Sequence, residues 1–138
     1  MATLTCNITL TNTEASGAMN VLSTNFKPQI FTNNEPEMMK TEISDSSITT
    51  PLIVDLSEHH NINYIYISGA YKDNDPVAGI VAGDYAPIEV ELNNSGVFVR
   101  VDKVLSLAGT LSALKIRKAN ADTKIVTITR IMSASGLP

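Results

Sequence analysis

Residue types that bind metal ions in proteins gather at two places in this chain of 138 residues. The first is the run Glu58, His59 and His60. Neighbouring side chains of an extended strand point to opposite faces, so the two imidazoles would converge on one ion only within a turn. Two imidazoles and one carboxylate, with no further histidine in the chain, are a poor zinc set. We predict a solvated turn here and no bound metal.

The second place is the segment from Asp73 through Asn74 and Asp75 to Asp84, whose oxygen-bearing side chains are of the kind that binds calcium. An EF-hand loop needs glycine at its sixth position and glutamate at its twelfth. Counted from Asp73, those positions hold Ala78 and Asp84. The pattern therefore predicts a turn held by hydrogen bonds from Asx side chains, without a metal or another cofactor.

Catalytic arrangements are equally hard to find in the sequence. The run Gly79–Gly83 lacks the Lys-Ser/Thr pair of a phosphate-binding loop, and no Gly-x-Ser-x-Gly sequence occurs. Glu89 and Glu91 alternate with apolar residues and fit the wet side of a strand. Cys6, the single cysteine, shares an apolar strand face and has no partner for an internal disulfide. We predict that the protein is not an enzyme.

The elements that hold these residues are strands, because apolar and polar residues alternate along most of the chain. In Ile88–Leu92 and again in Val97–Asp102, every second residue is apolar, and Asn93–Gly96 between them is rich in residues that tolerate positive φ. This pattern predicts a β-hairpin. The run Ile62–Ile67 is apolar on both faces, which is typical of a central strand.

Short strands separated by turns, without a long amphipathic helix, predict an all-β fold. We expect one domain over residues 1–138, an antiparallel β-sandwich or a jelly-roll-like barrel. Helical turns are expected at most at 14–24 and 36–42. The predicted strands are Thr3–Thr11, Gln29–Thr32, Ile48–Leu56, Ile62–Ser68, Ile88–Leu92, Val97–Lys103, Leu114–Lys118 and Lys124–Ile131.

Two polar or punctuated stretches, 33–50 and 70–87, are predicted to be long exposed loops. Loops of this length in a compact domain usually carry function or contact neighbours. We therefore expect partner contacts in the second loop and at its start. The candidate contact residues are Tyr71, Asp73, Asp75, Asp84 and Tyr85.

Charge is distributed unevenly along the chain, whose net charge is −4. Residues 1–99 hold three lysines and twelve acidic residues, whereas residues 100–138 hold seven basic residues and two acidic ones. This asymmetry indicates either solvated strand faces or head-to-tail complementarity between subunits. The negative total disfavours nucleic acid as a partner.

The apolar segments of the sequence are too short to predict a membrane span or a secretion signal. No window approaches about 20 consecutive apolar residues, so the sequence predicts no membrane span. The first residues lack a basic region followed by a long apolar stretch, so we expect no secretion signal.

Three segments stand out between about residues 60 and 131: Asn63–Ile67, Ala82–Ile88 and the closing strand Lys124–Ile131. Together they resemble small virion proteins of tailed bacteriophages. This resemblance implies a β-sandwich structural subunit on the capsid exterior or in the tail or fibre apparatus. Such a subunit works by assembling and has no catalytic role.

On this basis we expect a capsid decoration or cement protein, made in the host cytoplasm and located in the virion. Its expected partners are the major capsid protein or another virion protein, together with further copies of itself, and a trimer would suit capsid local symmetry. Two alternatives stay open. One is a tail, collar or fibre component, and the other is a carbohydrate-binding module that uses Tyr71 and Tyr85, although the chain has no tryptophan.

Overall fold

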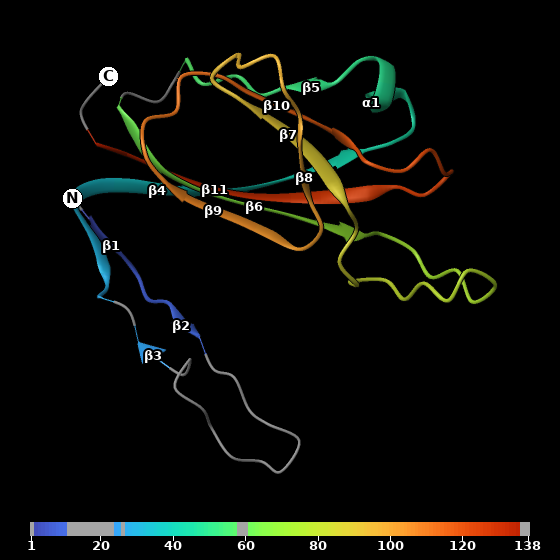
Figure 1. Ribbon diagram of the computed structural model, residues 1–138, viewed down its shortest axis with the longest axis horizontal. Helices are drawn as coiled ribbons and strands as arrows, with labels where there is room; N and C mark the ends of the chain where they lie inside the picture. Colours follow the sequence, from blue (N-terminus) through green and yellow to red (C-terminus); the bar gives the residue numbers. More distant parts are fainter. Residues whose placement is uncertain (1, 11–23, 26, 58–60, 136–138) are drawn as a thin grey trace, which may run out of the picture. The chain divides into compact units, whose positions relative to one another are not determined.

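The computed structural model describes residues 2–10, 24–25, 27–57 and 61–135 (Figure 1). These residues fall into two compact units, Met1–Glu35 and Pro36–Pro138, and each is described by itself. The elements in chain order are β1 (Ala2–Cys6), β2 (Thr9–Leu10), β3 (Thr24–Asn25), β4 (Gln29–Ile43), α1 (Ser46–Thr49), β5 (Leu52–Ile53), β6 (Ile62–Tyr71), β7 (Ile88–Leu92), β8 (Val99–Val101), β9 (Val104–Ala108), β10 (Leu114–Lys118) and β11 (Val126–Ser135).

The first unit consists of paired strands. β1 pairs antiparallel with the beginning of β4, with Leu4 opposite Phe31, and β2 pairs with β3. The strand predicted over Thr3–Thr11 is therefore two short strands, interrupted at residues 7–8. The helix expected over 14–24 lies outside the described residues, except for Thr24, which begins β3.

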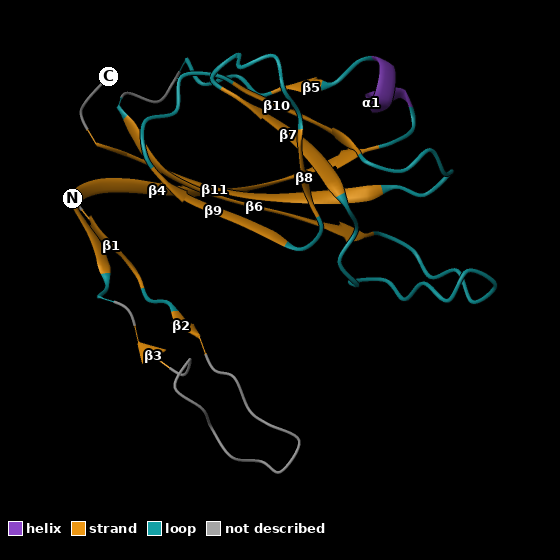
Figure 2. Cartoon of the chain, in the orientation of Figure 1, coloured by secondary structure: helices purple, strands orange, loops and turns teal. Residues whose placement is uncertain are grey.

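The second unit is an antiparallel β-sandwich, which confirms the predicted fold class. One sheet has the order β4-β11-β6-β9 and the other has the order β5-β10-β7-β8 (Figure 2). Apolar side chains on the facing sides of the two sheets form the core. The most deeply buried are Ile65, Ile67, Ile88, Val90, Leu114, Ile116, Val126 and Ile128.

The central strands of the first sheet are β6 and β11, as the apolar run Ile62–Ile67 predicted. β6 pairs with β11 on one side and with β9 on the other. At Gly69 the second sheet comes so close that a Cβ atom would lie 2.8 Å from the carbonyl oxygen of Ala86 and from Cγ2 of Ile88. Glycine is therefore required where the two layers meet.

The predicted hairpin is formed by β7 and β8, with Ile88 opposite Val101. Its turn contains Asn93 and Asn94 with φ of 54° and 52°, and Gly96 with φ of 80°. Asparagine and glycine tolerate this left-handed conformation better than other residues. The sequence pattern located this hairpin correctly because both its strands and its turn are local.

The loop predicted over 33–50 and the helical turn predicted over 36–42 are wrong. β4 continues to Ile43, and a single helical turn, α1, follows. Beyond Asn34 no described strand pairs with the side of β4 that faces away from β11. Such an edge accepts Pro36 and a polar sequence, because one side needs no ladder hydrogen bonds.

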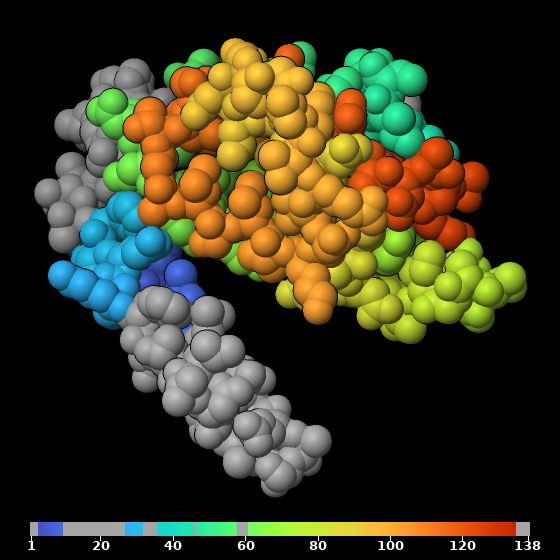
Figure 3. Space-filling view, in the orientation of Figure 1, coloured from blue at the N-terminus to red at the C-terminus, as the bar shows by residue number. Residues whose placement is uncertain are grey.

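Two further boundaries differ from the prediction. The strand expected over Ile48–Leu56 is reduced to the two residues of β5, because α1 occupies its beginning. β9 was not predicted. It forms the edge of the first sheet, and Figure 3 shows its stretch of chain in orange at the surface.

Candidate functional site

The loop 72–87, between β6 and β7, holds most of the predicted contact residues. The backbones of Asp75 and Ile80 exchange two hydrogen bonds, of 2.8 and 2.9 Å. The Asp75 carboxylate accepts the N–H of Ala78 at 3.3 Å and forms an ion pair with Lys124. The hydrogen bond from Lys124 lowers the pKa of Asp75. Asp75 therefore fastens the loop to the segment that leads into β11.

Asp84 and Asn74 also hold the loop together. The Tyr71 N–H donates to the Asp84 carbonyl at 2.9 Å, and the Val81 N–H donates to Asp84 Oδ2 at 3.3 Å. Asn74 Oδ1 accepts the N–H of Ala82 at 2.7 Å. The turn held by Asx side chains is thus confirmed.

Side chains that could bind a metal ion do not come together in the part of the chain that the structure describes. No group of three or more His, Cys, Asp or Glu side chains there is arranged to hold a metal ion. The predicted turn at Glu58, His59 and His60 lies outside that part. Asp73 lies beside Thr123 and Lys124 in the lining of a small cavity of about 140 Å³.

Tyr71 and Tyr85 lie on opposite faces of the first sheet. Tyr85 forms a β-bridge with Ala70, so their side chains share a face. Tyr71 follows Ala70 and points to the other face, where it packs against the core. These two rings therefore do not form the shared platform that was considered for a sugar.

The outer face of strands β9, β6 and β11, on the side away from the core, carries no charged side chain. The register places Ser68 between Thr129 on β11 and Val104 on β9, which fixes the members of this face. Most of them bear a hydroxyl group, and three of the chain's four tyrosines are included. We call it the hydroxyl face: Tyr64, Tyr66, Ser68, Ala70, Tyr85, Val104, Ser106, Ala108, Thr127, Thr129, Ile131 and Ser133.

One end of the hydroxyl face is more tightly packed than the other. The Tyr64 hydroxyl lies 2.8 Å from Ser106 Oγ, and both Tyr64 and Ser133 are buried. Toward the other end Tyr85 is 51% exposed.

Depletion of charge together with enrichment in tyrosine is typical of the centre of protein interfaces. The alternation Tyr-x-Tyr-x-Ser at 64–68 was the available sequence signal for this face.

The outer face of the second sheet is charged. Glu89 lies opposite Arg100 on β8 and 3.3 Å from Arg117 Nε on β10, and Glu91 lies 3.6 Å from Lys115 Nζ. The Arg117 guanidinium also stacks 3.8 Å from the centroid of the Phe98 ring. We call this the charged face: Glu89, Glu91, Phe98, Arg100, Lys115 and Arg117.

The charged face explains the uneven charge of the sequence. Basic residues of the segment 100–138 pair with acidic residues of the segment 1–99 across neighbouring strands. Lys124 and Asp75 follow the same rule. Opposite charges on adjacent strands stabilise a sheet, so these residues meet their partners within one chain. The asymmetry therefore gives no support to head-to-tail contact between subunits.

Lys118 carries a buried charge at the end of β10. Its side chain is 2% exposed, and Nζ lies 2.9 Å from Asp45 Oδ1 and 2.7 Å from the Asp122 carbonyl oxygen, with the Asp122 carboxylate also in contact. Burial alone would lower the pKa of Lys118, but hydrogen bonds to Asp122 and Asp45 outweigh it and raise the pKa. Burial would likewise raise the pKa of Asp122, and the hydrogen bond from Lys118 lowers it. This cluster joins the start of α1 to the turn before β11.

Arg130 points into the sandwich from β11 and is 6% exposed. Its Nη2 donates to Thr41 Oγ1 at 3.4 Å and to Met39 Sδ at 3.7 Å. Its Nε has no hydrogen-bond partner among the residues described. Burial lowers the pKa of Arg130, and the charge of Glu37 opposes that shift.

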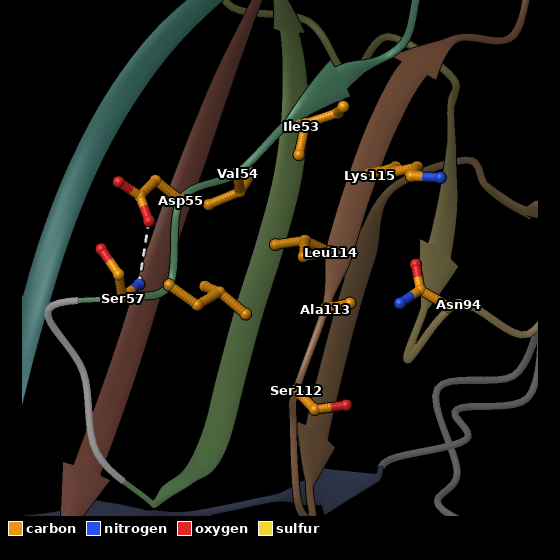
Figure 4. A pocket seen from close by; sticks show the side chains of 10 residues that line it. Ile53, Val54, Asp55, Ser57, Asn94, Ser112, Ala113, Leu114 and Lys115 are labelled. Carbon is orange, nitrogen blue, oxygen red and sulfur yellow. Dashed lines mark hydrogen bonds between the residues drawn. The ribbon is translucent and has the colours of Figure 1, made fainter.

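A cavity of about 550 Å³ lies beside β5 and the start of β10 (Figure 4). The Val54 N–H donates to the Leu114 carbonyl at 3.0 Å, and the chain that follows is not part of a strand. No sequence signal indicated this cavity, because it depends on where β5 ends. Its lining residues are Ile53, Val54, Asp55, Leu56, Ser57, Asn94, Ser112, Ala113, Leu114 and Lys115.

Comparisons with known proteins add no identification: no protein-family model matches the chain, and no curated protein matches it. Within the described residues, no helix is long and apolar enough to cross a membrane. The geometry of the second unit is therefore the basis for assigning a function. Its clearest surface feature is the difference between its hydroxyl face and its charged face.

Proposed function

We propose that this protein is a non-enzymatic structural subunit of a phage particle and binds a neighbouring virion protein through the hydroxyl face. One observation carries the proposal. Apart from the buried end at Tyr64 and Ser133, three adjacent strands present an uncharged outer surface, whereas the outer surface of the opposite sheet carries acidic and basic side chains. A face that meets only water does not need to lack charge, and a face that is covered by another protein benefits from lacking it.

The side chains of the hydroxyl face suit a flat protein contact. Tyr66 and Tyr85 offer rigid rings that lose little conformational entropy on binding, and each also carries a hydrogen-bonding hydroxyl. Thr127 and Thr129 lie on β11 opposite Ala70 and Ser68 and are short, so a partner surface can approach the sheet closely between the two rings. These properties favour a stable contact over a reaction with a small molecule.

The resemblance to phage virion proteins points to the setting. Its residues, about 60 to 131, include β6, β9 and the first part of β11 up to Ile131, the strands that form the hydroxyl face. We therefore place the protein on the capsid as a decoration or cement subunit that binds the major capsid protein. A tail, collar or fibre position would use the same face on a different virion protein.

A carbohydrate-binding role is the second candidate, and it now rests on a different pair of rings. Tyr66 and Tyr85 share the hydroxyl face, and Tyr85 is opposite Ala70, four positions from Tyr66 along β6. At about 3.3 Å per residue, the rings are about 13 Å apart along the strand. That spacing suits an extended oligosaccharide better than one sugar ring.

Binding to particles that lack this protein would test the proposal. Co-sedimentation should retain the unchanged chain and lose Thr129→Lys, which places a charge at the centre of the hydroxyl face. Ile53→Lys adds the same charge at an exposed position on the opposite sheet and should still bind. Equal binding of all three proteins would overturn the proposal. Binding to oligosaccharides that depends on Tyr66 and Tyr85, without binding to particles, would favour the carbohydrate role.

A further inference from the structure

β9 (Val104–Ala108) is the least protected of the open strand edges in the second unit. It pairs with β6 on one side, and among the described strands none pairs with its other side. The strand contains no charged residue and no proline, and its register with β6 runs without a bulge. Open edges with these properties are templates for pairing with another chain, and most natural proteins protect them.

The other open edges of this unit are protected. The free part of β4 contains Pro36, Lys40 and Glu42. β8 has three residues, of which one is Arg100, and β5 has only two residues. Charge, proline and short length all discourage the addition of a further strand. β9 is therefore the edge at which another strand is most easily added.

Hydrogen bonds at the two ends of β6 show which residues of β9 bond to it. The Gly109 N–H donates to the Asn63 carbonyl at 2.9 Å, and the Lys72 N–H donates to the Ile125 carbonyl at 3.0 Å. Hydrogen-bonding direction alternates along an antiparallel strand, so odd-numbered residues of β6 bond to β9 and even-numbered residues bond to β11. Because odd-numbered residues of β6 lie opposite odd-numbered residues of β9, the latter bond to β6.

The even-numbered residues of β9 direct their backbone groups toward the open side. The N–H and C=O groups of Val104, Ser106 and Ala108 point away from β6 by the same alternation. The side chains of these three residues are exposed and belong to the hydroxyl face. Leu105 and Leu107 between them are half-buried and pack against the core.

We propose that a second copy of this chain pairs antiparallel with β9 about a two-fold axis at Ser106. This register pairs every residue of β9 with a residue of β9 in the second copy and needs no residue outside the strand. Val104 lies opposite Ala108 of the second copy, and the two Ser106 residues lie opposite each other. The outward-directed N–H and C=O groups of β9 then bond to the second copy. An axis at Leu105 or Leu107 would leave part of the strand unpaired.

The side chains of the two strands match in this register. On the core side, Leu105 lies opposite Leu107 of the second copy, twice by symmetry. These are positions between hydrogen-bonded pairs, where side chains of neighbouring strands come closest. Both leucines are only half-buried in one copy, so the contact removes further apolar surface from water. An uncharged strand is the partner that this edge accepts without removing water from a charge, and β9 is itself such a strand.

The pair extends the sheet that carries the hydroxyl face. A two-fold axis between antiparallel strands is perpendicular to the sheet, so the hydroxyl faces of both copies lie on the same side. The pair does not rest on the proposed function, because backbone groups of β9 form it. It also differs from the trimer that suits capsid local symmetry, since a two-fold contact closes with two copies.

Light scattering after size exclusion would test the pair with a proline at its centre. The unchanged chain should be a dimer and Ser106→Pro should be a monomer, because proline lacks the N–H that donates to the second copy. That N–H makes no ladder bond within one copy, so circular dichroism should show the β-sheet spectrum of the unchanged chain. Ser106→Ala is the matched control. It also removes the hydroxyl that lies 2.8 Å from the Tyr64 hydroxyl, but it keeps the N–H and should stay dimeric.

Cysteine cross-linking would test the register. In a chain that carries Cys6→Ser, Ser106→Cys should form a disulfide-linked dimer on oxidation. The two residues 106 form a hydrogen-bonded pair with Cα atoms about 5.5 Å apart, which is within the range of a disulfide. Val104→Cys in the same background is the control, because residue 104 lies about 13 Å along the strand from its counterpart. It should cross-link several-fold less.

Several outcomes would overturn the proposed pair. These are an unchanged chain that is monomeric or trimeric, a folded Ser106→Pro that stays dimeric, a monomeric Ser106→Ala, and equal cross-linking of the two cysteine variants. If Ser106→Pro loses the β-sheet spectrum, the cross-linking decides. Thr129→Lys, on β11, should stay dimeric, so a failure of the hydroxyl face as a binding surface is distinguishable from a failure of this pair.

Discussion

The two outer faces of the sandwich cover the same core and differ in their side chains. The charged face arranges Glu89 between Arg100 and Arg117, so that its charges are compensated within the chain. The hydroxyl face has hydroxyl, methyl and aromatic groups in the same positions of the β-pleat. Along the strands of both sheets, the residues of the outer face alternate with apolar core residues. The core therefore does not dictate the difference in charge between the two faces. We propose that the difference reflects what each face contacts.

The energetic difference concerns the removal of water. A charged group that loses its hydration without a fully matched partner costs several kcal/mol, whereas a hydroxyl that exchanges water for a protein hydrogen bond costs much less. Thr129 and Tyr66 can therefore be covered by a partner with little loss. Arg117 and Glu89 are better left in contact with water. The charged face is therefore suited to contact with water, and the hydroxyl face is suited to contact with another protein.

The largest expected effect on stability concerns the cluster of Lys118, Asp45 and Asp122 at the end of β10. Lys118→Met should lower the free energy of unfolding by about 2 kcal/mol, since it leaves the Asp122 and Asp45 carboxylates without their buried partner. Urea unfolding at neutral pH measures this loss. A variant as stable as the unchanged protein would show that the cluster contributes no stability.

The same cluster makes stability depend on pH. The pKa of Asp122 is lower in the folded than in the unfolded chain. Its contribution to the free energy of unfolding is therefore complete above a pH of about 3.9 and is lost as the pH falls through the folded-state pKa. The pKa of Lys118 is higher in the folded than in the unfolded chain. Its contribution to the free energy of unfolding is therefore complete below a pH of about 10.4 and is lost as the pH rises through the folded-state pKa. Acid should therefore destabilise the unchanged protein more than Lys118→Met. Asp75, whose pKa is also lowered, leaves both proteins some acid sensitivity.

A smaller effect is expected from the cross-strand pair on the charged face. Glu89→Thr and Arg117→Thr, made singly and together, should reveal a coupling of about 0.5 kcal/mol, because both side chains are partly exposed. Arg117→Thr should be the more costly single change, since it also removes the stacking on Phe98. If the losses in the free energy of unfolding are strictly additive, the pairing of Glu89 with Arg117 is contradicted. The double variant also replaces two charges by hydroxyl groups, so that this face resembles the hydroxyl face.

The parts of this fold that the sequence predicts are those decided locally. The hairpin of β7 and β8 was predictable because Asn93, Asn94 and Gly96 mark its turn and both strands alternate beside it. β4 was not, because its exposed polar residues become a strand only by lying next to β11, far along the chain. A local pattern contains no information on such a neighbour.

The candidate site shows the same limit. Tyr71 and Tyr85 are close in sequence and were predicted to act together, yet the bridge between Ala70 and Tyr85 places them on opposite faces. The hydroxyl face instead combines β6 with β9 and β11, and only the register of three strands shows which side chains share it. Alternation predicts that a strand has two faces. It does not predict what the neighbouring strands add to each.

The smallest expected change in stability is the most informative about the two faces. Thr129→Lys should alter the free energy of unfolding by less than about 0.5 kcal/mol, because Thr129 is half-buried on an outer face and a lysine can extend its ammonium group into water. Urea unfolding measures this, and the same preparation should have lost its binding to particles. A large loss of stability would mean that the hydroxyl face is part of the folded core, and its lack of charge would then reflect packing within the subunit. Retained stability with lost binding would leave contact with another protein as the reason for the uncharged surface.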